Sequence, residues 1–195
     1  MTRLVGGVAG GRPLIVPDKG TRPTSDRARA ALFSSLDTLI ELPGARVLDL
    51  FAGTGAVGLE AASRGAVSVT LVDSGRDAAT ALRRNVDAVG LPGVVIRTQS
   101  VESFVDGPAP GPLEGFDVVF ADPPYAYPDA DLARLLGVLA TGDDWLAPDA
   151  VVVVERSKRG GPPAWPDVIQ PIKDKRYGES VLWYGRRIRR AEDPT

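Results

Sequence analysis

The chain of 195 residues contains no cysteine and no histidine. Without cysteine there are no disulfide bonds, thiolate nucleophiles or cysteine metal ligands, and without histidine the usual near-neutral base and the commonest metal ligand are missing. Long apolar runs are absent too, since the longest, residues 150–154, is far below the roughly twenty residues of a membrane span. Met1 begins no signal-peptide pattern. We therefore expect a cytoplasmic protein that uses neither membrane nor metal.

The net charge of −2 conceals a strong asymmetry along the chain. Residues 1–29 carry a net charge of +4, residues 30–155 carry −11, residues 156–190 carry +7 and the last five carry −2. Basic ends around an acidic centre are expected when the ends contact a polyanion and the centre holds a cationic cofactor. Solubilising surface charge is the alternative, and composition alone does not separate the two.

The hydrophobic pattern predicts one α/β domain built from alternating strands and helices. We expect an N-terminal extension over residues 1–20, a main domain over residues 21–190 and a short tail over residues 191–195. Residues 2–16 of the extension are expected to form a glycine-rich β-hairpin, and a hairpin that projects from a domain could reach a large partner. The predicted strands of the main domain are residues 46–50, 67–72, 94–97, 116–121 and 151–155, followed by an antiparallel hairpin of residues 168–177 and 180–186.

The chain is organised around residues 47–58, which read V-L-D-L-F-A-G-T-G-A-V-G. A buried-strand pattern passes here through a glycine turn into a helix, and such a turn brings backbone N–H groups close to a ligand. Gly53, Gly55 and Gly58 have the spacing of a dinucleotide-binding motif, with Asp73 at the end of the next strand. A nicotinamide or flavin oxidoreductase is therefore one interpretation of this segment.

Asp49 argues against a dinucleotide, because a carboxylate before the glycine turn would repel a pyrophosphate. S-adenosylmethionine (SAM) carries a sulfonium and an ammonium group, which Asp49 would attract, and its ribose hydroxyls could donate to Asp73. The structural alternative is that Asp49 merely caps the following helix.

A second motif, Asp122-Pro123-Pro124-Tyr125, follows the predicted strand 116–121. The prolines stiffen the turn, so that the Asp122 carboxylate and the Pro123 carbonyl can both accept hydrogen bonds from one exocyclic amine. Tyr125 offers a flat face for a base displaced from its helix. Orienting the amine toward a SAM methyl group is most of what such a transfer needs. The alternative is a proline-stiffened surface loop.

The two motifs together resemble the class I SAM-dependent amino-methyltransferases. R-P-T-S-D-R-A-R-A-A-L-F at residues 22–33, R-L-V-G-G at residues 3–7 and K-R-Y-G-E-S at residues 175–180 are similar to the RsmD family, which methylates N2 of a guanine in 16S ribosomal RNA. The resemblance covers nearly the whole chain. Ala30 and Ser34 depart from it, because the family usually has Glu and Asn there.

The resemblance implies a Rossmann-like fold, a seven-stranded, mostly parallel sheet with an antiparallel C-terminal strand. It implies that the protein acts on 16S rRNA in the small ribosomal subunit or an assembly intermediate. Separately from the resemblance, we expect a monomer, although the sequence does not define the oligomeric state. The predicted catalytic residues are Asp122, Pro123, Pro124 and Tyr125. The residues predicted to bind SAM are Asp49, Phe51, Ala52, Gly53, Thr54, Gly55, Asp73, Ser74, Ser100 and Val101.

Basic residues near both ends are candidates for RNA contacts. Arginines at a helix start oppose the helix dipole, so those entering the helix after residue 25 suggest a phosphate ligand. The predicted RNA-binding residues are Arg3, Arg12, Arg22, Arg27, Arg29, Lys173, Lys175 and Arg176. The same chemistry also suits an N6-adenine DNA methyltransferase or a protein-glutamine methyltransferase, and a non-catalytic SAM-sensing or RNA-binding module is a further alternative.

Overall fold

The structure is a computed structural model that describes residues 2–16, 26–109, 115–142 and 144–188. By its contacts the chain divides into two compact units, Met1–Val101 and Glu102–Thr195. This division differs from the predicted extension, main domain and tail, which stay a prediction. No helix in the described part of the chain is long and apolar enough to cross a bilayer.

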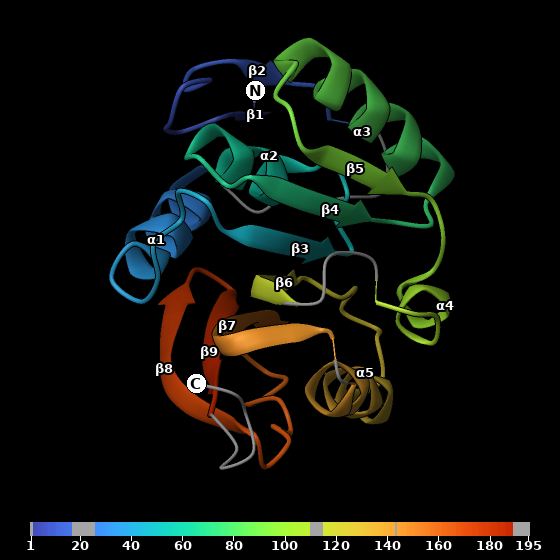
Figure 1. The fold of residues 1–195 in the computed structure, drawn as a ribbon. Coiled ribbons are helices and arrows are strands. Elements are labelled where there is room, and N and C mark those ends of the chain that lie inside the picture. The colour runs from blue at the N-terminus through green and yellow to red at the C-terminus, as the bar shows by residue number, and fades with distance from the viewer. Residues whose placement is uncertain (1, 17–25, 110–114, 143, 189–195) are drawn as a thin grey trace. The chain divides into compact units, whose positions relative to one another are not determined.

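The first unit contains a parallel sheet in the order β5-β4-β3 (Figure 1). Val47 pairs with Val69, and Val69 pairs with Val94. Leu48, Leu50 and Leu71 are completely buried, as expected for strands covered on both faces. Two of the three predicted strands are confirmed residue for residue, and the other begins one residue later. The bounds are β3 (Arg46–Leu50), β4 (Ser68–Val72) and β5 (Val94–Arg97).

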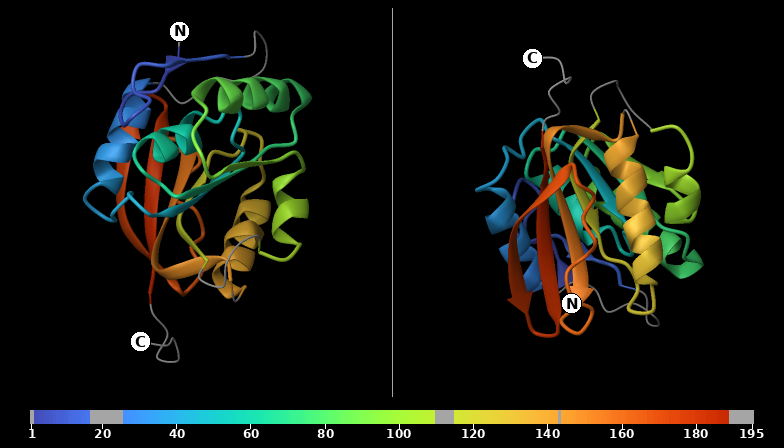
Figure 2. Two further views of the ribbon diagram at one scale, coloured as in Figure 1. Left: turned by 45° about the horizontal axis from the view of Figure 1, so that its top comes forward. Right: turned by 90° about the horizontal axis from the view of Figure 1, so that it is seen from below.

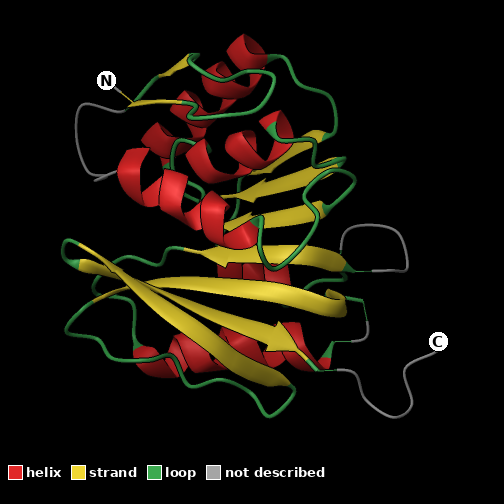
Figure 3. Cartoon of the chain, turned by 90° about the vertical axis from the view of Figure 1, so that its left-hand side faces the viewer, coloured by secondary structure: helices red, strands yellow, loops and turns green. Residues whose placement is uncertain are grey.

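Helices connect these strands and cover the sheet (Figure 3). The helix α2 (Ala56–Ser63) packs against β3 and β4, and α3 (Arg76–Val89) packs against β5. The close approach of α2 depends on Gly58, because a Cβ there would lie 2.2 Å from Cδ2 of Leu71. A further helix, α1 (Asp26–Leu36), precedes β3.

The N-terminal hairpin is present, but it packs on the helices of its own unit. Strands β1 (Thr2–Arg3) and β2 (Pro13–Leu14) pair antiparallel. The hairpin does not project freely from this unit, because Leu4, Ala9 and Leu14 are buried against α2 and α3. These side chains share one core with residues of the two helices: Leu4, Ala9, Leu14, Ala56, Leu59 and Val89. A contact of the hairpin with a large partner stays a prediction.

The second unit contains a sheet in the order β6-β7-β9-β8. Strand β7 runs parallel to β6, whereas β9 runs antiparallel to both β7 and β8. The predicted C-terminal hairpin is therefore confirmed. The strand predicted at residues 151–155 is longer, since Leu146 already pairs with Phe116. The bounds are β6 (Phe116–Ala121), β7 (Leu146–Ser157), β8 (Ile169–Tyr177) and β9 (Ser180–Arg187).

Two helices belong to this part of the chain. The short α4 (Val101–Val105), which the sequence did not predict, follows β5, and α5 (Asp129–Thr141) joins β6 to β7 (Figure 2). Leucines at helical spacing form the buried face of α5: Leu132, Leu135, Leu136 and Leu139. The two units together have the seven strands, mostly parallel, and the antiparallel strand near the C-terminus that the sequence predicts, which confirms the α/β class.

Candidate functional site

The glycine loop, residues 51–55, connects β3 to α2 and has an unusual backbone. Gly53 and Gly55 have φ angles of 56° and 76°, and Phe51 has a φ of 60° although it is not glycine. A left-handed φ is costly for a side chain with a Cβ, and such strain tends to persist where function requires it. A Cβ added at Gly53 would meet only the Phe51 carbonyl oxygen, at 3.9 Å, so the space beside this residue is open. The loop therefore has the backbone of a ligand-binding turn.

Asp73, directly after β4, fixes the position of this loop. Its Oδ2 accepts a hydrogen bond from the Gly53 N–H at 2.8 Å, and its Oδ1 accepts one from the Gly75 N–H at 2.7 Å. A carboxylate has about four lone-pair sites, so these two bonds leave acceptor capacity for a ligand hydroxyl. The predicted ribose contact is thus chemically compatible with the structural role of Asp73.

Asp49 is 1% exposed and lies beneath the start of α2. Its Oδ2 accepts a hydrogen bond from the Gly58 N–H at 2.8 Å, so it does cap the helix. The pKa of Asp49 is raised to about 7, mainly because the carboxylate is buried; the hydrogen bond from Gly58 opposes this rise and the charge of Asp73 adds to it. A cationic ligand near the glycine loop would favour the ionised form.

Asn85 is a residue of this site that sequence reasoning missed. It is 1% exposed on α3, and its Nδ2 donates to the Thr54 carbonyl at 2.9 Å and to the Ile15 carbonyl at 3.0 Å. Its Oδ1 accepts from the Ile15 N–H at 2.7 Å. The glycine loop is therefore tied to the segment after the N-terminal hairpin. A polar side chain three residues after Leu82, on the apolar stripe of α3, was the available sequence signal.

The remaining predicted SAM-binding residues follow strand ends in the first unit. Ser74 is exposed just after β4, and Ser100 is half-buried just before α4. Val101 is buried at the start of that helix. The carboxyl ends of neighbouring parallel strands share one edge of the sheet, where ligands of such folds bind. Their contact with a cofactor stays a prediction.

The acceptor loop, residues 122–125, follows β6 in the second unit as predicted. Asp122 is half-buried, Pro123 is buried and Tyr125 is 70% exposed. An exposed tyrosine ring next to a rigid turn suits stacking on a base. The Pro124 carbonyl accepts a hydrogen bond from the Tyr127 N–H at 2.8 Å, which closes the turn.

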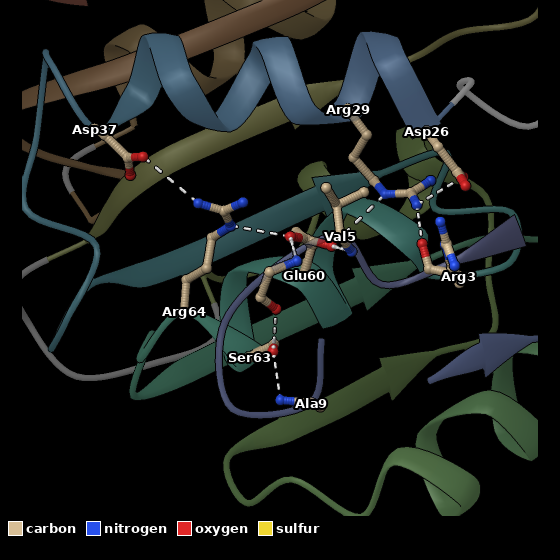
Figure 4. Close-up of polar contacts among 10 residues, drawn as sticks. Arg3, Val5, Ala9, Asp26, Arg29, Asp37, Glu60, Ser63 and Arg64 are labelled. Atoms are coloured by element: carbon tan, nitrogen blue, oxygen red, sulfur yellow. Dashed lines mark hydrogen bonds and ion pairs between the residues drawn. The ribbon is translucent and has the colours of Figure 1, made fainter. Parts of the chain in front are cut away.

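One predicted RNA contact is wrong. Arg29 is 0% exposed, and its guanidinium group lies 3.0 Å from Asp26 and 3.8 Å from the buried Glu60 (Figure 4). The cation that appeared unfavourable at the start of α1 is stabilised by these carboxylates, so no phosphate is needed to explain it. Glu60 is the signal that sequence reasoning overlooked, because it is the only charged residue of the otherwise small and apolar α2.

The other basic candidates differ in their surroundings. Arg12 donates to the Val89 carbonyl at 2.6 Å, at the C-terminal end of α3, which gives it a structural role. Lys173 lies 5.1 Å from the Tyr184 ring centroid, and its pKa is lowered by desolvation and by Lys175. Arg22 lies outside the described residues. Arg12 is nevertheless exposed, and so are the remaining candidates, Arg3, Arg27, Lys175 and Arg176.

The polar groups around the glycine loop fit SAM better than a metal ion. The open space at Gly53 and the acceptors of Asp49 and Asp73 suit a ligand with cationic and hydroxyl groups. Among the described residues there is no group of three or more carboxylates, histidines or cysteines that could hold a metal ion.

Comparison with known proteins agrees with this fold. A family model described as "Conserved hypothetical protein 95" matches residues 2–186. "Ribosomal RNA small subunit methyltransferase D" of Escherichia coli strain K12 is 35% identical over 165 residues, covering 84% of this chain and 79% of the relative. The protein of the same name from Haemophilus influenzae is 35% identical over 159 residues, covering 80% and 79%.

A solved structure, described as the putative methyltransferase yhhF from Escherichia coli, matches with a TM-score of 0.83 and 30% identity. The match covers 97% of this chain and 99% of that chain. The fold is thus that of the Rossmann-like, class I methyltransferases. The chain belongs to the RsmD family, as the resemblance of its motifs predicts.

Proposed function

We propose that this protein is a SAM-dependent RNA methyltransferase that methylates the N2 amine of a guanine in 16S ribosomal RNA, in a small subunit or an assembly intermediate. Two features of the chain support this proposal most directly. Asp73 holds the glycine loop through the N–H of Gly53, and the Asp122-Pro123-Pro124-Tyr125 loop comes directly after β6. Family membership supports the proposal, since the curated relatives are named ribosomal RNA small subunit methyltransferases. We further propose that it acts as a cytoplasmic monomer.

The residues of the first unit would hold the cofactor. The Asp49 carboxylate would stabilise a cationic group, Asp73 would accept from ribose hydroxyls, and Ser100 and Val101 would contact the base. Bound SAM supplies a methyl group on a sulfonium, which a neutral amine can attack. The glycine loop has its binding conformation before the cofactor arrives, because Asp73 bonds to Gly53 and Asn85 bonds to Thr54. Cofactor binding therefore costs little conformational entropy.

The residues of the acceptor loop would orient the amine. The Asp122 carboxylate and the Pro123 carbonyl accept its two N–H groups, which directs the nitrogen lone pair away from them, and Tyr125 stacks on the guanine. After transfer the nitrogen is cationic and acidic, and its proton passes to Asp122 or to solvent. This scheme needs no thiol or imidazole, in agreement with a sequence that contains neither cysteine nor histidine.

RNA contacts are assigned to the exposed basic residues of both ends. Arg3 and Arg27 belong to the first unit, and Lys175 and Arg176 lie on β8. Such side chains neutralise phosphates and supply affinity without reading the base sequence. A basic edge strand also discourages aggregation, so β8 has a second reason for its charge.

The test is to offer methyl-labelled SAM with small ribosomal subunits, naked 16S RNA, duplex DNA and protein in separate reactions, and to digest the labelled product to nucleosides. We expect N2-methylguanosine from the ribosomal substrate. Asp122→Ala should abolish transfer and leave SAM binding by calorimetry nearly unchanged. Asp131→Ala, which removes an exposed carboxylate of α5, is the control. Label in DNA or protein alone would overturn the proposal, and so would loss of SAM binding in Asp122→Ala, which would make this residue structural.

A further inference from the structure

A hydrogen bond joins the segment after the acceptor loop to α4. The hydroxyl of Tyr127 donates to Oε1 of Glu102 at 2.6 Å. Tyr127 is two residues beyond Tyr125, and Glu102 directly follows the predicted SAM-binding residues Ser100 and Val101 in the sequence. Both residues belong to the second unit, and the bond connects Glu102 of α4 to the residues that follow the acceptor loop.

The backbone of Tyr127 is held at both of its polar groups. Its N–H donates to the Pro124 carbonyl at 2.8 Å, and its carbonyl accepts from Nη1 of Arg156 at 3.4 Å. Arg156, on β7, also pairs with Asp129 at the start of α5. The acceptor loop, β7 and α5 thus contribute to fixing the backbone of Tyr127, although this residue lies outside the motif of residues 122–125.

The hydroxyl of Tyr127 keeps its proton and donates it in the hydrogen bond to Glu102. Desolvation raises its pKa above the ordinary tyrosine value, and the hydrogen bond and charge of Glu102 raise it further. The phenol stays protonated at neutral pH, so its proton remains available to Glu102. A bond from a hydroxyl to a carboxylate is charge-assisted and stronger than a neutral one.

We propose that Tyr127 and Glu102 are positioning residues for methyl transfer: their hydrogen bond holds the acceptor loop in the conformation in which Asp122 and Pro123 receive the amine. The inference rests on the proposed function, because it assigns a task to the bond only if the acceptor loop orients a substrate. Neither residue contacts the reacting atoms in this scheme. Their contribution is to keep the turn at Pro123 and Pro124 in place, where a small displacement is costly for the rate.

The variants for the test separate the bond from the side chains. Tyr127→Phe removes the hydroxyl and keeps the ring, Glu102→Ala removes the acceptor, and Glu102→Gln keeps a neutral oxygen acceptor. Arg134→Ala is the matched control. Arg134 pairs with Asp106 at 2.8 Å, so its removal breaks another bond between α5 and the segment after α4. The charge of Arg134 lowers the pKa of Tyr127, but its removal leaves the hydrogen bond from Tyr127 to Glu102 in place.

The kinetic experiment measures methylation of small ribosomal subunits. We expect Tyr127→Phe and Glu102→Ala each to lower kcat by about 10- to 100-fold, with the KM for RNA and the Kd for SAM within about twofold of the wild type. The double variant should be no slower than the worse single variant, because both remove one bond. Glu102→Gln should recover most of the rate, and Arg134→Ala should keep all of it. Wild-type kcat in Tyr127→Phe, or multiplied defects in the double variant, would overturn the proposal.

Amide hydrogen exchange supplies a readout that does not depend on turnover. Positions 123, 124 and 128 are prolines without an amide hydrogen, so the exchange of residues 122–128 reports on four amides only, those of Asp122, Tyr125, Ala126 and Tyr127. This exchange should accelerate in Tyr127→Phe and Glu102→Ala and stay unchanged in Glu102→Gln and Arg134→Ala. Unchanged exchange in the first two variants would overturn the positioning role even if the wild type methylates RNA. An inactive wild type with this exchange pattern would instead refute the proposed function, and the bond would keep only its structural role in holding the loop.

Discussion

The buried guanidinium of Arg29 faces the buried carboxylate of Glu60, with Nε and Oε2 3.8 Å apart. Glu60 also accepts hydrogen bonds from the N–H groups of Val5 and Gly6, at 2.6 and 2.7 Å, and pairs with Arg64 at 3.0 Å (Figure 4). One carboxylate on α2 therefore joins the N-terminal hairpin to α1. Breaking a buried ion pair from one side is destabilising, although Glu60 keeps Arg64 and the two N–H groups as partners when Arg29 is removed.

Arg27 and Arg29 form a matched pair for separating RNA binding from stability. Arg29→Ala should lower the free energy of unfolding by at most about 3 to 5 kcal/mol, measured by denaturant titration, because Glu60 retains Arg64 and two N–H groups as partners. Arg27 is exposed on the same helix, so Arg27→Ala should leave the unfolding midpoint unchanged. If Arg27 contacts a phosphate, its removal should flatten the salt dependence of RNA binding by a slope of about 1. An unchanged slope would remove Arg27 from the interface, and an unchanged stability of Arg29→Ala would refute the role of the ion pair.

Gly7 and Gly11 form a second matched pair, in the hairpin. Both have left-handed φ angles, 74° and 85°, so alanine strains the backbone at both positions. At Gly7 a Cβ would also lie 1.9 Å from the Ser63 carbonyl oxygen, whereas at Gly11 it would meet nothing within 4 Å. Gly11→Ala should cost about 1 kcal/mol. Gly7→Ala should cost more and detach the hairpin, because a backbone atom cannot move aside as a side chain does.

Limited proteolysis and amide exchange over residues 2–14 distinguish these outcomes. Detachment should expose the hairpin to cleavage in Gly7→Ala and leave it protected in Gly11→Ala. Equal protection in the two variants would show that the contact with Ser63 is not what holds the hairpin on α2.

Asp49 should make stability depend on pH. Its folded-state pKa, about 7, exceeds the ordinary value of 3.8, so the folded protein binds this proton more tightly than the unfolded chain. The contribution of this group to stability is therefore full below about pH 4 and is lost as the pH rises through about 7. Asp49→Asn keeps an acceptor for Gly58 and removes the buried charge. It should raise the free energy of unfolding at pH 8 by about 2 to 4 kcal/mol and change little at pH 4.

Asp49→Asn should also weaken SAM binding, since the stabilised cation loses its partner. In the wild type we expect the Kd measured by calorimetry to fall as the pH rises from 5.5 to 8, because binding favours the ionised carboxylate, and the variant should show no such trend. Asp77→Asn, at an exposed position in the first turn of α3, is the control. If Asp49→Asn bound SAM with the wild-type Kd at pH 8, Asp49 would serve only as a cap of α2 and not as a partner of the cofactor.

Asn85 should be needed for the shape of the glycine loop. Asn85→Asp keeps the acceptor for the Ile15 N–H but loses both donors and places a carboxylate oxygen against the Thr54 and Ile15 carbonyls. We expect weaker SAM binding and a loss of unfolding free energy of about 3 kcal/mol. Arg84→Ala, at the exposed neighbouring position, should alter neither property. SAM binding at wild-type strength in Asn85→Asp would show that the loop keeps its shape without this residue.

Local patterns in the sequence were sufficient for much of this protein. The mainly apolar runs at residues 46–50 and 116–121 indicate strands by themselves, because strands covered on both faces are apolar along most of their length. Their few charged residues are Arg46, Asp49 and Asp117. The glycines at positions 53 and 55 imply a turn with left-handed backbone, since other residues rarely adopt it. The two motifs, with the segments around them, were specific enough to indicate the family.

Only the tertiary structure decided which charged and polar groups serve the fold. Whether an arginine at a helix start faces a phosphate or a buried glutamate depends on which helix lies beside it, and Glu60 is 31 residues away from Arg29 in the chain. The same holds for Asn85, whose partners at Ile15 and Thr54 are 70 and 31 residues distant. A polar side chain is satisfied by whatever packing brings to it, and a local pattern carries no information about such distant contacts.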